Sequence, residues 1–203
     1  MIRCKPLLGT FVEILVQDGM GTSVAIDKAF LAIEQVQSLM GFHDPDSELS
    51  KINALAHLQP IQIHPWTAQV LTTAKDIYRQ SDGLFDCGIG HHLVKTALLP
   101  KHLYFDQYSF GVFGGLENLH FLDSNTVHSD LPLCLDLGGI AKGFAVDMAV
   151  QAMQSAGVSS GCVNAGGDLR IFGKEARPIQ VSHPANPHEL IHIGDICEGA
   201  IAT

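Results

Sequence analysis

The 203-residue sequence predicts an α+β fold, and three observations support this class. A β-branched, apolar run at Thr10–Val16 comes first, three amphipathic helical patterns follow it, and further strand-like runs come later in the chain. This grouping differs from the regular alternation of strands and helices that builds a doubly wound parallel sheet. A hydrophobic content of 46% allows a large core in one domain or in two intimate subdomains.

The first helical pattern follows the Thr10–Val16 strand. Gly19 and Gly21 end that strand, and we expect Thr22 or Ser23 to be the N-cap of the helix. Apolar residues then recur at helical spacing from Ile26 to Met40.

Two more helices are predicted before the middle of the chain. Asp44 is expected to be the N-cap of the first, with Pro45 at its first helical position. The apolar side of that helix consists of Leu49, Ile52 and Leu55. The other helix extends from Trp66 to Tyr78, and Ser81-Asp82-Gly83 closes it.

Short β-like runs replace the helical patterns from Lys101 to Asp130. These runs are Tyr104-Phe105, Phe110 to Phe113 and Thr126 to His128, separated by Gly114-Gly115 and Asn118. A longer apolar run, Leu131 to Leu137, predicts a buried strand.

A helix is predicted after Gly138-Gly139 break this strand, because apolar residues share one helical face from Ile140 to Ala152 and Gly157 ends the pattern. Two strands joined by a glycine-rich turn then span Gly161 to Gly173. The remaining predicted strands are Ile179 to Ser182, Leu190 to Ile193 and Ala200 to Ala202.

The passage from strand to glycine pair to helix suits the binding of an anion, because it presents backbone N–H groups. Lys142 is expected in the first turn of that helix, where the macrodipole disfavours a cation. Two interpretations remain open, a lysine that faces a ligand and a lysine that caps a turn which only packs. The spacing of a Walker loop is absent.

Charge and composition exclude some classes of partner. The net charge of −9 and the lack of a basic cluster argue against nucleic acid and anionic membrane surfaces. We see no apolar leader and no transmembrane run, so we expect a cytoplasmic protein with no transmembrane segment. Five cysteines without a Cys-x-x-Cys pair suit reduced, mostly buried thiols. The adjacent His91-His92 fit a surface turn better than a metal site.

Five motifs occur in order: LLGTFVEI, MGFHDPDSELSKIN, DGLFD, DLGGIAKGFAVD and VNAGGD. In this order and spacing they resemble the ApbE family of FAD:protein FMN transferases, from about Arg3 to the last residue. The resemblance implies one ApbE-like domain over residues 1–203, with a T-fold-like α+β architecture of two intimate subdomains.

The activity that the resemblance implies is a magnesium-dependent transfer of FMN from FAD to a threonine or serine hydroxyl. The acceptor is a target flavoprotein, and AMP is released. Such a transfer needs neutralisation of the pyrophosphate charge and in-line placement of the hydroxyl. FAD is then the substrate, and Mg²⁺ is the metal.

The match to DLGGIAKG implies that Asp136 contacts the flavin nucleotide, that Lys142 lies beside it, and that the carbonyl of Gly139 binds magnesium. From the residues alone, Asp136 is also explained as a cap of the turn that ends the strand.

The other motifs imply further flavin contacts. DGLFD gives Leu84, Phe85 and Asp86, although Phe85 is also explained as a core residue. His43 stands where relatives often carry a stacking aromatic, and a plain loop histidine is the alternative. Leu8 stands where relatives often carry a methionine against the flavin. The Gly-Gly-Asp turn of VNAGGD is expected to shape the site.

The sequence also departs from the family pattern. Cys87-Gly88 replaces a common threonine-valine pair, and Gly41 stands where serine is common. The chain stops at Ala202-Thr203 inside a strand-like run, whereas the family continues into a region with a proposed catalytic histidine and two metal ligands. We therefore expect the domain to be C-terminally incomplete, and no catalytic base is assigned. The alternatives are an FAD-binding protein without transferase activity and an FAD pyrophosphatase.

Overall fold

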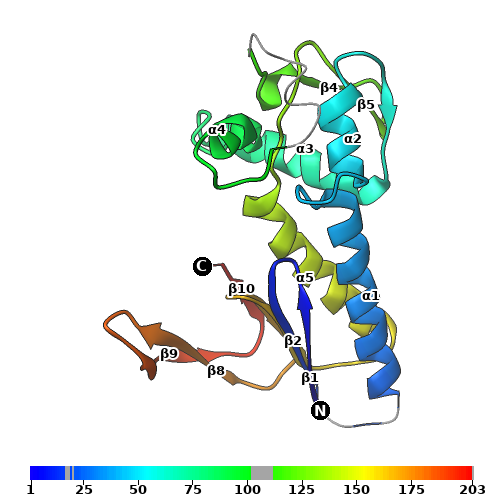
Figure 1. Cartoon of the computed structure of the whole chain (residues 1–203). Coiled ribbons are helices and arrows are strands. Elements are labelled where there is room, and N and C mark those ends of the chain that lie inside the picture. The colour runs from blue at the N-terminus through cyan, green and yellow to red at the C-terminus, as the bar shows by residue number, and fades with distance from the viewer. Residues whose placement is uncertain (17–18, 20, 102–111, 203) are drawn as a thin grey trace. The chain divides into compact units, whose positions relative to one another are not determined.

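The computed structural model describes residues 1–16, 19, 21–101 and 112–202 (Figure 1). These residues form two compact units. Unit 1 comprises residues 1–34 and 145–203, and unit 2 comprises residues 35–144. The predicted run Tyr104-Phe105 and the first half of Phe110 to Phe113 lie outside the described residues.

Unit 1 is built on a five-stranded antiparallel sheet in the order β1-β2-β6-β7-β10. Its strands are β1 (Ile2–Leu7), β2 (Thr10–Val16), β6 (Gly161–Ala165), β7 (Asp168–Phe172) and β10 (Gly199–Ile201). A separate hairpin consists of β8 (Arg177–His183) and β9 (Asn186–Ile196). Strand β1 was not predicted, because it alternates charged and apolar residues over a short span that includes a proline.

The helical parts of unit 1 come from α1 (Thr22–Met40) and α5 (Gly138–Ser155). The fully buried core side chains of the unit are Val12, Ile14 and Val163 from the sheet, Ile26, Phe30 and Ile33 from α1, and Ala149, Val150 and Met153 from α5. Two ion pairs of 2.6 Å, Arg3–Asp27 and Arg170–Asp147, show that β1 lies beside α1 and β7 beside α5.

Unit 2 combines helices with a small sheet in the order β3-β5-β4. Its helices are α2 (Glu48–Leu55), α3 (Pro65–Gln80), α4 (Gly90–Lys95) and the short 3₁₀ helices η1 (Cys87–Ile89) and η3 (Leu116–Asn118). The strands are β3 (Ile61–Gln62), β4 (Leu119–Phe121) and β5 (Thr126–Ser129). The first turns of α5 also belong to this unit.

Most predicted elements are confirmed, and the α+β class with them. Helices α1 and α3 and the β6–β7 hairpin occupy their predicted places. The predicted N-cap Asp44 is wrong. Ser47 caps α2, because its buried hydroxyl accepts a hydrogen bond of 3.1 Å from the N–H of Ser50. Asp44 instead belongs to the preceding turn, where its carboxylate accepts from the N–H of Asp46.

The predicted strand Leu131 to Leu137 is wrong as secondary structure and right as a buried segment. Leu133, Cys134, Leu135 and Leu137 are all buried. Only Leu133 makes a β-bridge, an isolated parallel one with Gly114. Helix α5 begins directly after this segment, at Gly138 rather than after the glycine pair, so Lys142 opens its second turn.

None of the helices in the described ranges has both the length and the apolar composition that a membrane crossing needs.

Two glycines with space for a Cβ, one within α5 and one just after it, give a matched stability test. Gly157 follows the helix with φ +89°, and Gly143 lies within the helix; a Cβ on either would meet no atom within 4 Å. Gly157→Ala should lower the free energy of unfolding by about 1 kcal/mol, because alanine is strained at positive φ. Gly143→Ala should raise it by about 0.5–1 kcal/mol, because alanine has the higher helix propensity. Urea unfolding monitored by circular dichroism measures both; equal effects of the two substitutions would contradict this account.

Candidate functional site

The candidate site surrounds the extended segment Cys134–Leu137 of unit 2, which leads into α5 at Gly138. Leu135 and Leu137 are buried, and Asp136 between them is only half-buried. This alternation places the carboxylate of Asp136 toward the surface at the start of α5. The segment crosses the interior outside any sheet, so its backbone polar groups need other partners.

Asn53 of α2 supplies two of these partners. Its Nδ2 donates to the carbonyl oxygen of Leu135 at 2.9 Å, and its Oδ1 accepts from the N–H of Leu135 at 2.8 Å. The side chain is only 1% exposed. Sequence reasoning did not single out Asn53, although it ends the motif MGFHDPDSELSKIN and follows the core residue Ile52. A polar residue in that position was the available signal, because a buried amide is almost always hydrogen-bonded.

DGLFD and the residue directly after it, Cys87, fix the backbone of Asp136, the residue that follows Leu135. Asp86 is the N-cap of η1 and accepts a hydrogen bond of 2.7 Å from the N–H of Gly88. The carbonyl of Cys87 then accepts from the N–H of Asp136 at 2.8 Å. At Gly90 the two segments approach so closely that a Cβ would lie 2.3 Å from the carbonyl oxygen of Cys134. The second and third motifs therefore both fix the backbone around Asp136.

Phe85 brings an aromatic ring to the start of α5. Its Cε2 lies 3.5 Å from the position that a Cβ on Gly139 would occupy. The ring is half-buried, so it is neither a core residue nor fully solvated. Leu84 beside it is 92% exposed, which is unusual for a leucine and leaves an apolar side chain available for contact.

The carboxylate of Asp136 caps the helix that it precedes. Its Oδ1 accepts a hydrogen bond of 3.2 Å from the N–H of Gly138. This confirms the turn-cap interpretation of Asp136, while its contact with a ligand remains a prediction. In the first helical turn, the N–H of Gly138 donates to Asp136, and those of Ile140 and Ala141 donate to the carbonyl of Leu137. What this end of α5 offers an anion is therefore the positive end of the helix dipole.

Burial raises the pKa of Asp136, whereas the hydrogen bond from Gly138 and the nearby His43 lower it. Burial, together with the charge of Asp136, also raises the pKa of the buried thiols Cys87 and Cys134 to about 12. Both thiols are therefore protonated at neutral pH and suit packing rather than nucleophilic chemistry. His43 itself is exposed and lies close enough to Asp136 to act on its charge.

The remaining predicted site residues divide between the two units. Lys142 is half-buried in the second turn of α5, in unit 2. Leu8 belongs to unit 1, at the two-residue turn between β1 and β2, with a φ of 56° that is rare for leucine. The VNAGGD turn lies beside it in the same sheet, since Val12 pairs with Ala165. Unit 2 thus brings together the residues of three motifs, and unit 1 those of two.

The prediction of a surface turn at His91-His92 is wrong, because both residues belong to α4. His91 stacks on Phe113 at 5.3 Å between ring centroids and contacts the carbonyl of Gly88 at 3.1 Å. The described part of the chain contains no group of three or more His, Cys, Asp or Glu side chains arranged to hold a metal ion. The carbonyl oxygen of Gly139 therefore stays a predicted ligand of Mg²⁺, a cation that prefers oxygen.

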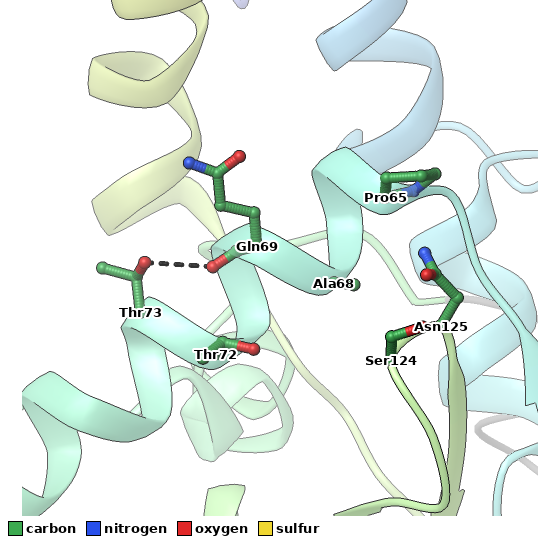
Figure 2. A pocket seen from close by; sticks show the side chains of 7 residues that line it. All are labelled: Pro65, Ala68, Gln69, Thr72, Thr73, Ser124 and Asn125. Atoms are coloured by element: carbon green, nitrogen blue, oxygen red, sulfur yellow. Dashed lines mark hydrogen bonds between the residues drawn. The ribbon is translucent and has the colours of Figure 1, made fainter.

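A shallow pocket of about 320 Å³ lies elsewhere in unit 2, between α3 and the turn from β4 to β5 (Figure 2). Its lining is small and mostly polar: Pro65, Ala68, Gln69, Thr72, Thr73, Ser124 and Asn125. The hydroxyl of Thr73 is used within α3, where it donates to the carbonyl of Gln69 at 3.0 Å. The pocket contains none of the predicted site residues.

Comparison with known sequences identifies relatives of the whole chain. A model of the ApbE family matches residues 8–203. A Vibrio cholerae protein named FAD:protein FMN transferase is 27% identical over 218 residues, covering 98% of this chain and 64% of its own length. A Chlamydia trachomatis protein of the same name is 32% identical over 194 residues, covering 88% and 56%. This chain therefore spans less than two thirds of either relative.

Solved structures give the same result for the fold. The ApbE protein from Thermotoga maritima superposes with a TM-score of 0.86 at 25% identity, covering 100% of this chain and 69% of that one. A variant of the flavin transferase ApbE from Vibrio cholerae gives a TM-score of 0.79 at 25% identity, covering 96% and 70%.

The raised pKa of Asp136 predicts how pH acts on stability. When a carboxyl has a higher pKa in the folded than in the unfolded protein, the folded protein becomes less stable as the pH rises from the unfolded pKa to the folded pKa. The raised pKa of Asp136 has this effect. Asp136→Asn removes this charge and keeps an oxygen for the N–H of Gly138. The stability of the variant relative to the wild type should therefore increase from pH 4 to pH 8. Chemical denaturation across this range measures the difference, and an opposite slope would contradict the burial of the charge.

Thiol reactivity gives a second prediction. With a pKa of about 12, only about one in 10⁴ molecules carries a thiolate at Cys87 or Cys134 at pH 8. A disulfide reagent should label the exposed Cys4 and Cys197 first and reach these two buried thiols only after unfolding. Mass spectrometry of timed samples identifies the labelled sites, and early labelling of Cys87 or Cys134 would show that the segment opens in the native state.

Proposed function

The chain belongs to the ApbE family, and from this premise we propose that it is a magnesium-dependent FAD:protein FMN transferase. In the proposed reaction, FMN passes from FAD to a threonine or serine hydroxyl of a target flavoprotein, and AMP is released. The observation that carries the proposal is the meeting of three separate motifs at one helix start. His43, the Phe85-Asp86 pair and the segment from Asp136 to Gly139 all lie there.

The reaction breaks the pyrophosphate of FAD. The acceptor hydroxyl oxygen attacks the phosphorus of the FMN half, forming a phosphoester, and the bond from that phosphorus to the bridging oxygen breaks. AMP leaves with the bridging oxygen, and the hydroxyl proton is lost to solvent or to a base. The protein itself forms no covalent bond in this reaction. Its contribution to catalysis is therefore to position the reactants and to neutralise the phosphate charge.

The residues of unit 2 fit the polar part of this substrate. The positive end of the α5 dipole and the cation of Lys142 suit a negatively charged pyrophosphate. The ring of Phe85 and the exposed side chain of Leu84 suit an aromatic flavin or adenine. Asp136, Asp86 and His43 are proposed to hydrogen-bond or stack with the nucleotide. The contact of Leu8 with the flavin stays a prediction from the family resemblance.

We propose the carbonyl of Gly139 as one ligand of magnesium, beside phosphate oxygens of FAD and water. The described residues contain no group of three or more His, Cys, Asp or Glu side chains that could hold the ion. When bound, Mg²⁺ neutralises phosphate charge and supports departure of AMP. The protein's own contribution is to present that carbonyl at the start of α5.

A labelling experiment tests the proposed function. The protein is incubated with FAD, MgCl₂ and a threonine-containing acceptor peptide, and AMP, free FMN and FMN-peptide are separated by chromatography and mass spectrometry. We expect equal amounts of AMP and FMN-peptide, with loss of both on removal of magnesium. AMP with free FMN would indicate a pyrophosphatase, and bound FAD without AMP would indicate a flavin-binding protein.

Lysine substitutions provide the matched control. Lys142→Met should weaken FAD binding about tenfold, because it removes a charge beside the pyrophosphate. Lys51→Met removes an exposed lysine from α2 and should leave binding unchanged. Equal effects of the two substitutions would remove Lys142 from the site.

A further inference from the structure

We propose that Asn53 is the positioning residue of the flavin site: its side-chain amide takes the place of a neighbouring strand and fixes the backbone from which Asp136 projects. This inference rests on the proposed function, since it treats Asp136 as a contact of the flavin nucleotide. Asn53 itself is buried inside unit 2.

The geometry of the two hydrogen bonds supports this role. In extended backbone the N–H and C=O of one residue point to the same side, and in a sheet an adjacent strand pairs with both. At Leu135 the amide of Asn53 pairs with both, at 2.8 and 2.9 Å. Among uncharged side chains, an amide offers an acceptor and a donor in one plane at this spacing, as asparagine and glutamine do.

The next residue, Asp136, is held by η1 and by the start of α5. The N–H of Asp136 donates to the carbonyl of Cys87, and the Oδ1 of Asp136 accepts from Gly138. Hydrogen bonds therefore fix the backbone around Asp136. Asn53 of α2 holds Leu135, which precedes it, and Cys87 of η1 and Gly138 of α5 hold Asp136 itself. Without Asn53, Leu135 would keep its burial but lose both backbone partners, which costs more than the loss of an exposed hydrogen bond.

Such a device sets position more than it sets overall stability. Leu133, Leu135 and Leu137 are buried apolar side chains, so the segment stays in the core with or without the amide. The amide adds a fixed position of the Leu135 backbone relative to α2. A shift of about 1 Å at a binding group is enough to lower activity strongly.

Ser129 offers a matched control. It is fully buried in the same unit, and its hydroxyl also pairs with both backbone groups of one residue. It donates to the carbonyl of Leu131 at 2.6 Å and accepts from the N–H of Leu131 at 3.4 Å. Ser129→Ala therefore removes a similar pair of hydrogen bonds, made to Leu131, which lies five residues before Asp136.

The experiment compares the wild type with Asn53→Ala, Asn53→Asp and Ser129→Ala. Asn53→Asp keeps the shape of the side chain and an acceptor for Leu135, and it loses the donor. Three quantities are measured on the full chain: the Tm, the affinity for FAD with its visible circular dichroism when bound, and the hydrogen exchange of the amides of Leu135 and Asp136.

We expect both Asn53 variants to bind FAD about tenfold more weakly or worse, with an altered flavin dichroism and faster exchange at Leu135 and Asp136. Ser129→Ala should lower the Tm without these changes. Equal FAD affinity in Asn53→Ala and Ser129→Ala would overturn the proposal. Failure of both Asn53 variants to fold would also overturn it, because Asn53 would then determine the whole fold rather than the site.

Failure of the proposed function gives a different result. If the wild type binds no FAD, the transferase proposal fails, and the exchange rates alone decide whether Asn53 positions Asp136. Faster exchange confined to residues 135 and 136 in Asn53→Ala supports that role, and unchanged exchange removes it.

Discussion

The structure around α5 depends on one constraint, the satisfaction of backbone polar groups in a buried segment that has no sheet to join. Leu135 is paired by the amide of Asn53, and Asp136 by the carbonyl of Cys87. Because these partners come from α2 and η1, the placement of the two elements sets the position of the segment's backbone. The position of the start of α5, where the positive end of the helix dipole lies, follows from that placement.

The sequence predicts the helices well because their signals are local. The helical spacing of α1 and α3 and the glycine-rich turn between β6 and β7 depend on neighbouring residues alone. Leu131 to Leu137 was misjudged for the opposite reason. An apolar run indicates burial, but a strand also needs a partner, and here an asparagine 82 residues away replaces that partner.

The candidate site was predictable only in part. The motifs gave Asp136, Gly139 and Phe85, which the structure brings together. The cap at Asp136 was one of two interpretations of that residue. The motifs gave no indication that Asp86 accepts a hydrogen bond from the N–H of Gly88, since capping depends on how the backbone turns. Asn53 was missed because a buried amide is recognised by its partners, and those lie far away in the chain.

The sequence separation of Asn53 and Leu135 also bears on how the protein folds. Contacts that close a loop of 82 residues are entropically expensive and form after local helices and hairpins in most small domains. Helices α2 and α3 and the β6–β7 hairpin can therefore appear early, while the backbone around Asp136 is set only when the distant segments meet. During refolding, ligand affinity should consequently arise after most of the helical signal, so that a newly collapsed chain is helical before it is competent to bind.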